Sequence, residues 1–420
     1  MITVNKVNNF LLAIIFLQML FFPKIYMNQK MIFVFLAMSI YIIKKRLTLK
    51  MGVGKILILF YLCWNIVSII IGICRGYGQE ALRLGTVDVL WPMIYLLLAS
   101  EGLTRRQVKW LYKALVKITF CFVILDIVLI VASLANIDNI KKIFIMFNLK
   151  TPYATKGSGF LAFRVDHLYF YAFLTPFMLA LLLKQDKSVF EKLGLKSWFV
   201  RVTALLSVIM SLLTGMGGVW LACFLALFIC IYQSHIIKNR KVIFSILLLG
   251  CIGLAIFIRS YIIKGSVFYI VDEILQKFGA SSTSKIESVR ISQIKAMLAA
   301  WIDHPMVGNG RGYPVGYMRL NEYYFSSSHE MSYFVMLYQK GIIGLLSFFS
   351  IVFYSVRVLL KKTEISWFLK PFFVGFICFL VSNNFNPYLA NFSCMWILFL
   401  PIVMEQHNQI AGRVQFEKED

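Results

Sequence analysis

The sequence predicts an all-α polytopic integral membrane protein with about twelve transmembrane helices. Three observations predict this fold class: 60% of the 420 residues are hydrophobic, only 15% are charged, and the apolar residues gather in long runs. Soluble globular chains contain about 45–50% apolar and about 25% charged residues, whereas each membrane-spanning helix needs roughly 20 apolar residues. The composition therefore excludes a secreted module, a soluble enzyme, a disordered chain and a nucleic-acid-binding protein.

The apolar runs follow one another along the whole chain, with no fixed repeat and no low-complexity linker between them. We therefore predict a single membrane domain over residues 1–420. The expected spans are 10–26, 29–43, 56–74, 87–100, 111–135, 168–183, 198–213, 218–234, 242–261, 331–356, 368–383 and 388–404.

The distribution of Lys and Arg predicts the orientation of these spans. With a cytoplasmic N-terminus, the short inner loops carry 21 Lys and Arg residues and the short outer loops carry 4. Cytoplasmic loops of membrane proteins are enriched in these two residue types, and the net charge of +24 is first a topology signal. We therefore expect both termini to be cytoplasmic.

Two long segments, 136–167 and 259–328, are then extracytoplasmic, and the second is the major outer loop before helix ten. Together they hold 13 Lys and Arg against 7 Asp and Glu. Long translocated loops are nearly exempt from the charge rule. The excess of cations indicates either an anionic ligand or attraction to anionic lipid headgroups.

The major outer loop contains a predicted amphipathic helix near 288–302, which ends before His304-Pro305. Its apolar residues recur at helical spacing, which is typical of a helix lying on a membrane surface. Arg290 falls in its first turn. A guanidinium there can bind a phosphate through two parallel hydrogen bonds, or it can extend to lipid headgroups.

A glycine-rich turn, Gly308-Asn-Gly310-Arg311-Gly312, follows this helix. It follows a helix instead of a strand and lacks the Lys-Ser/Thr of a P-loop, so a nucleotide site is not predicted. The glycines favour a tight turn that brings backbone amides and Arg311 close to a partner. A plain re-entry loop is the alternative.

The tenth span opens at Ser326-Ser-Ser-His329-Glu330. Ser327 and Glu330 have the spacing of a capping box, which would place His329 in the first helical turn. The positive helix end would keep the imidazole neutral, and a neutral imidazole is a competent general base. A structural histidine and a purely capping Glu330 are the alternatives.

Two charges fall inside predicted spans, Asp126 and Lys340. Charges inside a membrane are costly and are functional candidates by default. We predict that these two form a structural ion pair with each other.

The order of these motifs resembles the O-antigen ligase and O-antigen or capsular polysaccharide polymerase superfamily. The shared motifs are Arg290, His304-Pro-Met-Val-Gly308-Asn-Gly310, His329, Gly341-Ile-Ile-Gly344 and Asn386-Pro-Tyr-Leu389. The chain departs from the family where an arginine is expected at Gly217 and where Glu330 follows the histidine. Arg164, Arg311 or Lys156 would then supply the missing cation.

The resemblance implies a GT-C-like glycosyltransferase without metal or cofactor in the bacterial cytoplasmic membrane. It would transfer a glycan from undecaprenyl pyrophosphate to a sugar hydroxyl, as a repeat-unit polymerase. The site would use His329 or Glu330 as base and Arg290 and Arg311 as pyrophosphate ligands. Membrane lipid, a flippase and a chain-length regulator are implied partners, and nucleic acid is not. An O-antigen ligase and a flippase or transporter of lipid-linked glycans are the alternatives.

Overall fold

A computed structural model describes residues 4–21, 27–44, 52–98, 103, 105–134, 165, 167–184, 187–233, 285–319, 322–361 and 365–405. The chain is mostly helical and forms two compact units. The first comprises Met1–Thr104, Lys285–Thr363 and Asn383–Asp420, and the second comprises Arg105–Ser284 and Glu364–Ser382. Both units contain long apolar helices, and our expectation of a single membrane domain stays a prediction.

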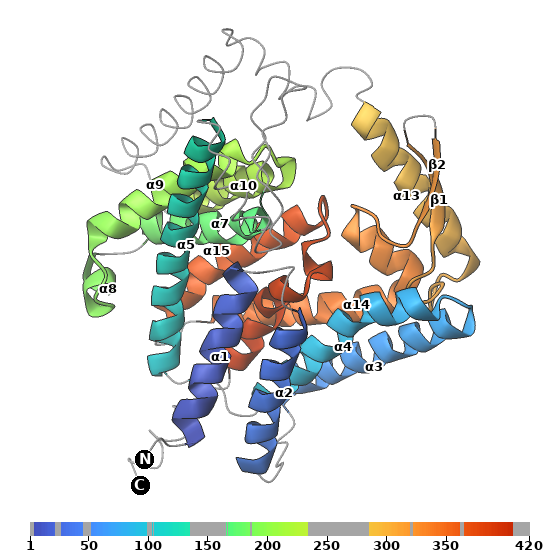
Figure 1. The fold of residues 1–420 in the computed structure, drawn as a ribbon, viewed down its shortest axis with the longest axis horizontal. Helices are drawn as coiled ribbons and strands as arrows, with labels where there is room; N and C mark the ends of the chain where they lie inside the picture. The colour runs from blue at the N-terminus through green and yellow to red at the C-terminus, as the bar shows by residue number, and fades with distance from the viewer. Residues whose placement is uncertain are drawn as a thin grey trace. The chain divides into compact units, whose positions relative to one another are not determined.

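The first unit contains an antiparallel pair of long helices, α3 (Val53–Cys74) and α4 (Gly78–Leu98), which lie side by side (Figure 1). Helix α14 (Ser332–Leu360) packs against α3. The remaining helices of this unit are α1 (Val4–Phe21), α2 (Met27–Lys44), α13 (Lys285–Asp303), the 3-10 turns η3 (Tyr388–Ala390) and η4 (Phe392–Cys394), and an apolar helix within Phe392–Glu405.

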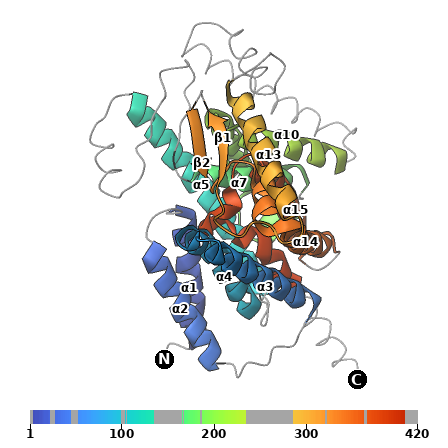
Figure 2. The same ribbon diagram turned by 90° about the vertical axis from the view of Figure 1, so that its right-hand side faces the viewer.

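A two-stranded antiparallel sheet lies beside α13 and corrects the all-α prediction (Figure 2). Its strands are β1 (Val315–Arg319) and β2 (Glu322–Ser326). The strands are rich in aromatic residues, which favour extended structure. Their alternation buries Val315 and Tyr317 on one face. On the other face, Tyr323 and Phe325 are exposed.

The predicted amphipathic helix is confirmed as α13, with bounds Lys285–Asp303. Its apolar side packs on protein, because Met297 belongs to a buried cluster with Val315, Met331, Val335 and Tyr338. This apolar side therefore stabilises the sheet and the start of α14. The predicted location of the helix on the outer membrane surface stays a prediction.

The second unit packs helix α7 against α9 and α10, and α5 against α9. Its elements are α5 (Arg105–Leu134), η2 (Leu168–Phe170), α7 (Tyr171–Lys184), α8 (Lys187–Lys192), α9 (Ser197–Leu213), α10 (Gly217–Gln233) and most of α15 (Ser366–Asn383).

The predicted pair between Asp126 and Lys340 is wrong. The Asp126 carboxylate instead contacts His167 Nε2 at 2.8 Å and accepts a hydrogen bond from the Tyr171 hydroxyl at 2.6 Å. Asp126 and Tyr171 are fully buried and His167 is 3% exposed. A nearby imidazole and hydroxyl satisfy the carboxylate locally, so it needs no distant cation.

Four helices in the described part of the chain are long and apolar enough to cross a membrane. They are Val53–Cys74, Arg106–Ala132, Ser332–Leu360 and Ser366–Asn383, and six shorter apolar helices accompany them. The protein is therefore a helical membrane protein. Each predicted span coincides at least in part with a described helix, except 242–261, which lies outside the described residues. The count of twelve stays a prediction, as does the first outer loop, most of which is also outside them.

Candidate functional site

The centre of the first unit is a break in helix α14 at Gly341, whose φ of 67° and ψ of −174° are not helical. The break leaves the carbonyl groups of the preceding turn without their usual helical partners. The glycine turn after α13 fills this place: Asn309 N donates to Tyr338 O at 2.8 Å, and Gly310 N donates to Gln339 O at 2.9 Å. The two glycine motifs of the sequence therefore bind each other.

The close approach of these segments explains why glycine is needed. A Cβ on Gly308 would lie 2.5 Å from Gly341 N, and one on Gly310 would lie 2.5 Å from Gly72 N of α3. The prediction of a tight turn is therefore confirmed. The amides at Asn309, Gly310 and Arg311 are used by helix carbonyl groups and are not free to hold an anion.

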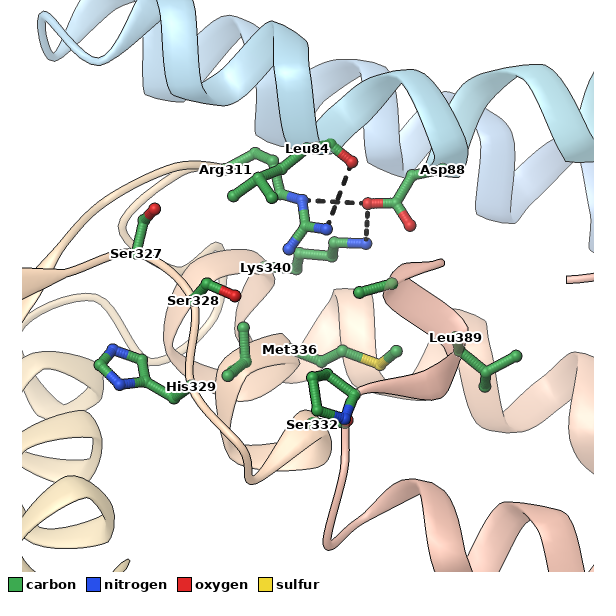
Figure 3. Close-up of a pocket in the computed structure, with 13 residues that line it drawn as sticks. Leu84, Asp88, Arg311, Ser327, Ser328, His329, Ser332, Met336, Lys340 and Leu389 are labelled. Atoms are coloured by element: carbon green, nitrogen blue, oxygen red, sulfur yellow. Dashed lines mark hydrogen bonds and ion pairs between the residues drawn. The ribbon is translucent and has the colours of Figure 1, made fainter. Parts of the chain in front are cut away.

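The turn places Arg311 in a buried ionic cluster with Asp88 of α4 and Lys340 of α14. Asp88 Oδ2 lies 3.1 Å from Arg311 Nε and 2.8 Å from Lys340 Nζ. Figure 3 marks both contacts with dashed lines. The exposed fractions are 6% for Arg311, 4% for Asp88 and 2% for Lys340. Two cations and one carboxylate leave this cluster with one net positive charge.

Helix α3 contacts Lys340 both at its backbone carbonyl and at its side-chain ammonium. The Trp64 indole donates to the Lys340 carbonyl at 2.8 Å, which satisfies a group exposed by the break at Gly341. The Lys340 ammonium donates to Asn65 Oδ1 at 2.7 Å. Neighbouring residues of one helix thus fix the backbone and the charge of Lys340 together.

The cluster forms one wall of a pocket, and apolar side chains form much of the rest (Figure 3). The polar lining comes from Asp88, Arg311, Ser327, Ser328, His329, Ser332 and Lys340, and the apolar lining from Leu84, Val335, Met336, Pro387, Leu389 and Ala390. The pocket thus brings cationic and apolar groups together.

The cations of this wall retain hydrogen-bonding capacity. Arg311 has five N–H donors. Within the described residues it donates to Gln339 Oε1 at 2.7 Å and to Leu84 O at 3.4 Å, while its Nε lacks a hydrogen bond of ordinary geometry to Asp88. Lys340 has three donors and uses two, with Asn65 and Asp88. Buried donors normally find acceptors, and these remaining N–H groups are available to one.

His329 lines the pocket by its position, but its ring points away from Arg311 and Lys340 (Figure 3). The ring contacts Tyr317 and Tyr338, with centroid distances of 5.2 and 6.1 Å. Neither ring nitrogen has a hydrogen bond of ordinary geometry in the described part of the chain, and loss of hydration lowers the pKa of His329, partly opposed by the Ser326 backbone. The imidazole is therefore held neutral, by burial.

The predicted capping box is wrong. Helix α14 begins at Ser332, its N-cap is Met331 without a side-chain cap, and His329 precedes the helix. The Ser327 hydroxyl donates to Glu80 Oε2 at 3.3 Å, and its carbonyl accepts from Gln339 Nε2 at 2.9 Å. Because Ser327 is held by these partners, it cannot cap the helix.

Arg290 and Glu330 form an ion pair at 3.0 Å, with exposed side-chain fractions of 35% and 51%. The pair joins Arg290 to the residue that follows the pocket-lining His329 in the sequence, although neither charged residue lines the pocket itself. Their predicted roles as phosphate ligand and base stay predictions.

The remaining predicted cations, Lys156 and Arg164, lie outside the described residues. Gly217 begins α10 in the second unit.

Sequence reasoning missed Asp88, although a carboxylate in the apolar run 87–100 was a visible signal. It also gave Lys340 the wrong partner.

No group of three or more His, Cys, Asp and Glu side chains among the described residues is placed to hold a metal ion. Comparison of the sequence with models of known protein families and with curated proteins gives no match.

Proposed function

We propose that this membrane protein transfers a glycan from an undecaprenyl pyrophosphate carrier to a sugar hydroxyl, as a repeat-unit polymerase of the kind its motifs resemble. The observation that carries the proposal is the buried pair of cations, Arg311 and Lys340, on the wall of a pocket with an apolar side. A lipid-linked pyrophosphate has the matching chemistry: an anionic head that needs fixed cations and a prenyl chain that needs an apolar surface.

In this reaction the acceptor hydroxyl attacks the anomeric carbon, and the bond from that carbon to the pyrophosphate oxygen breaks. Arg311 and Lys340 stabilise the charge that develops on the departing pyrophosphate, and fixed donors of this kind contribute about 10²–10³ each in rate. Arg290 would guide the incoming anion. The proton of the acceptor passes to a base, for which His329 is the first candidate and Glu330 the second; His329 would have to turn its ring into the pocket.

The proposal includes the finer expectations from the sequence. They are about twelve spans in a GT-C-like arrangement, both termini in the cytoplasm of a bacterium, and a site on the outer face of the cytoplasmic membrane. A flippase would supply the donor, a chain-length regulator would act on the product, and no metal or nucleic acid takes part.

The length of surface polysaccharide in cells that lack the protein tests this function. A polymerase defect leaves chains of a single repeat. Long polymer that is not attached to its lipid acceptor would instead identify a ligase, and an unchanged ladder would refute both.

A flippase or transporter of lipid-linked glycans is the second candidate, and the break in α14 favours it. Transporters bind ions and substrates where helices are interrupted inside the membrane, and Gly341 interrupts α14 directly beside Lys340. A transporter defect would leave lipid-linked repeats on the cytoplasmic face, whereas a polymerase defect would leave them on the outer face.

A further inference from the structure

Asp88 is the acidic member of the ionic cluster, and one of its oxygens contacts both cations. Oδ2 lies 2.8 Å from Lys340 Nζ and 3.1 Å from Arg311 Nε. The other oxygen accepts a long hydrogen bond of 3.5 Å from the Tyr61 hydroxyl. A single carboxylate oxygen thus occupies the position between the two cations where an oxygen of a bound phosphate would otherwise lie.

We infer that Asp88 determines specificity by acting as a built-in anion that a ligand must outcompete for Arg311 and Lys340. This inference rests on the proposed function and adds a selection rule to it. The pocket has a cationic wall and an apolar wall, so without Asp88 any phospholipid would match its chemistry. Phospholipids with one phosphate greatly outnumber lipid-linked pyrophosphates in a membrane, and they would fill the site.

The charges explain how the carboxylate discriminates. A phosphodiester headgroup carries one negative charge, as Asp88 does, so displacing Asp88 from the two cations only exchanges one singly charged oxyanion for another. A pyrophosphate diester carries two, so once it has displaced Asp88 it can neutralise both cations. Charge interactions are strong at such buried positions, and specificity often depends on a repulsive element directed against the wrong ligand.

Two soluble amphiphiles test the inference on the purified full-length protein by titration calorimetry. Farnesyl pyrophosphate, a monoester with up to three negative charges near neutral pH, represents prenyl pyrophosphates, and dihexanoyl phosphatidylglycerol represents lipids with one phosphodiester. We expect the unaltered protein to bind farnesyl pyrophosphate at least tenfold more tightly. Asp88→Asn should reduce this ratio to threefold or less, mainly because phosphatidylglycerol now binds.

Asp126→Asn is the matched control, because it removes another buried carboxylate outside the pocket and should keep the original ratio. If Asp88→Asn does not fold, the double variant Asp88→Asn/Lys340→Met restores the net charge of the cluster and should also fail to discriminate. A tenfold preference that persists in the folded Asp88 variants would overturn the inference.

The binding data also separate this inference from the proposed function. If the unaltered protein binds both amphiphiles equally well, Asp88 does not select the ligand, while the pocket is still an anion site. If it binds neither, the pocket is not a site for lipid phosphates, and both the proposed function and the inference fail.

Discussion

The contact between Gly308 and the break at Gly341 predicts a large loss of stability when Gly308 is replaced by alanine. Gly308 has a φ of 75°, and an added Cβ would lie 2.5 Å from Gln339 C and from Gly341 N. Those backbone atoms belong to the segment that the glycine turn binds through hydrogen bonds, so they cannot move without breaking that contact.

The magnitude follows from two costs. A side chain in the left-handed region costs about 1–2 kcal/mol, and forcing extra volume into a packed interior costs about 1–3 kcal/mol. We therefore expect Gly308→Ala to lower the free energy of unfolding by about 2–5 kcal/mol and to reduce chain growth, because the turn carries Arg311.

Gly76 provides a control that separates the two costs. Its φ is 87°, but an added Cβ would have no atom within 4 Å. Gly76→Ala should therefore lose only the backbone strain of about 1–2 kcal/mol. Unfolding by titration with dodecyl sulfate in micelles measures both variants. The packing argument is refuted if Gly308→Ala is no less stable than Gly76→Ala.

Three further variants have expected outcomes. His329→Gln should stop chain growth at normal protein level, and a normal polysaccharide ladder from this variant would leave Glu330 as the base. Because burial lowers the pKa of His329, the activity of the unaltered protein should fall only at acidic pH. Arg290→Ala should cost under about 1 kcal/mol of stability, since its ion pair is exposed, yet slow chain growth about 10²-fold; normal growth would remove Arg290 from the site. Trp64→Phe should cost about 1–3 kcal/mol in the same unfolding assay, because the Lys340 carbonyl loses its donor; an unchanged unfolding midpoint would contradict this.

Much of the helical framework could be predicted from the sequence, because hydropathy reports directly on long buried helices. The start of α4 was the main error in span bounds: the helix begins at Gly78, whereas the predicted span began at 87. Its first turns contain Glu80 and Arg83. These charged residues lower the local hydropathy, so a search for apolar runs does not include them in a span. The sheet was missed for a related reason, since each of its strands has five residues and is far shorter than any membrane span.

The site was less predictable, because its residues meet only through tertiary structure. Local spacing correctly indicated the tight turn at Gly308 to Gly312, but it suggested a capping box at Ser327 that hydrogen bonds to Glu80 and Gln339 prevent. Nothing in the spacing of Asp88 and Lys340 shows that they meet. Their contact depends on the break at Gly341, whose non-helical backbone no hydropathy pattern reports.

The most direct test of the account is polymerisation of an undecaprenyl pyrophosphate-linked repeat unit by the purified protein in lipid nanodiscs, with Lys340→Met compared with the exposed Lys370→Met. We predict that the unaltered protein and Lys370→Met extend the chain, and that Lys340→Met, purified in folded form, is slower by about 10²–10³. Extension by Lys340→Met at the rate of the unaltered protein would contradict the role of the buried cations in the reaction.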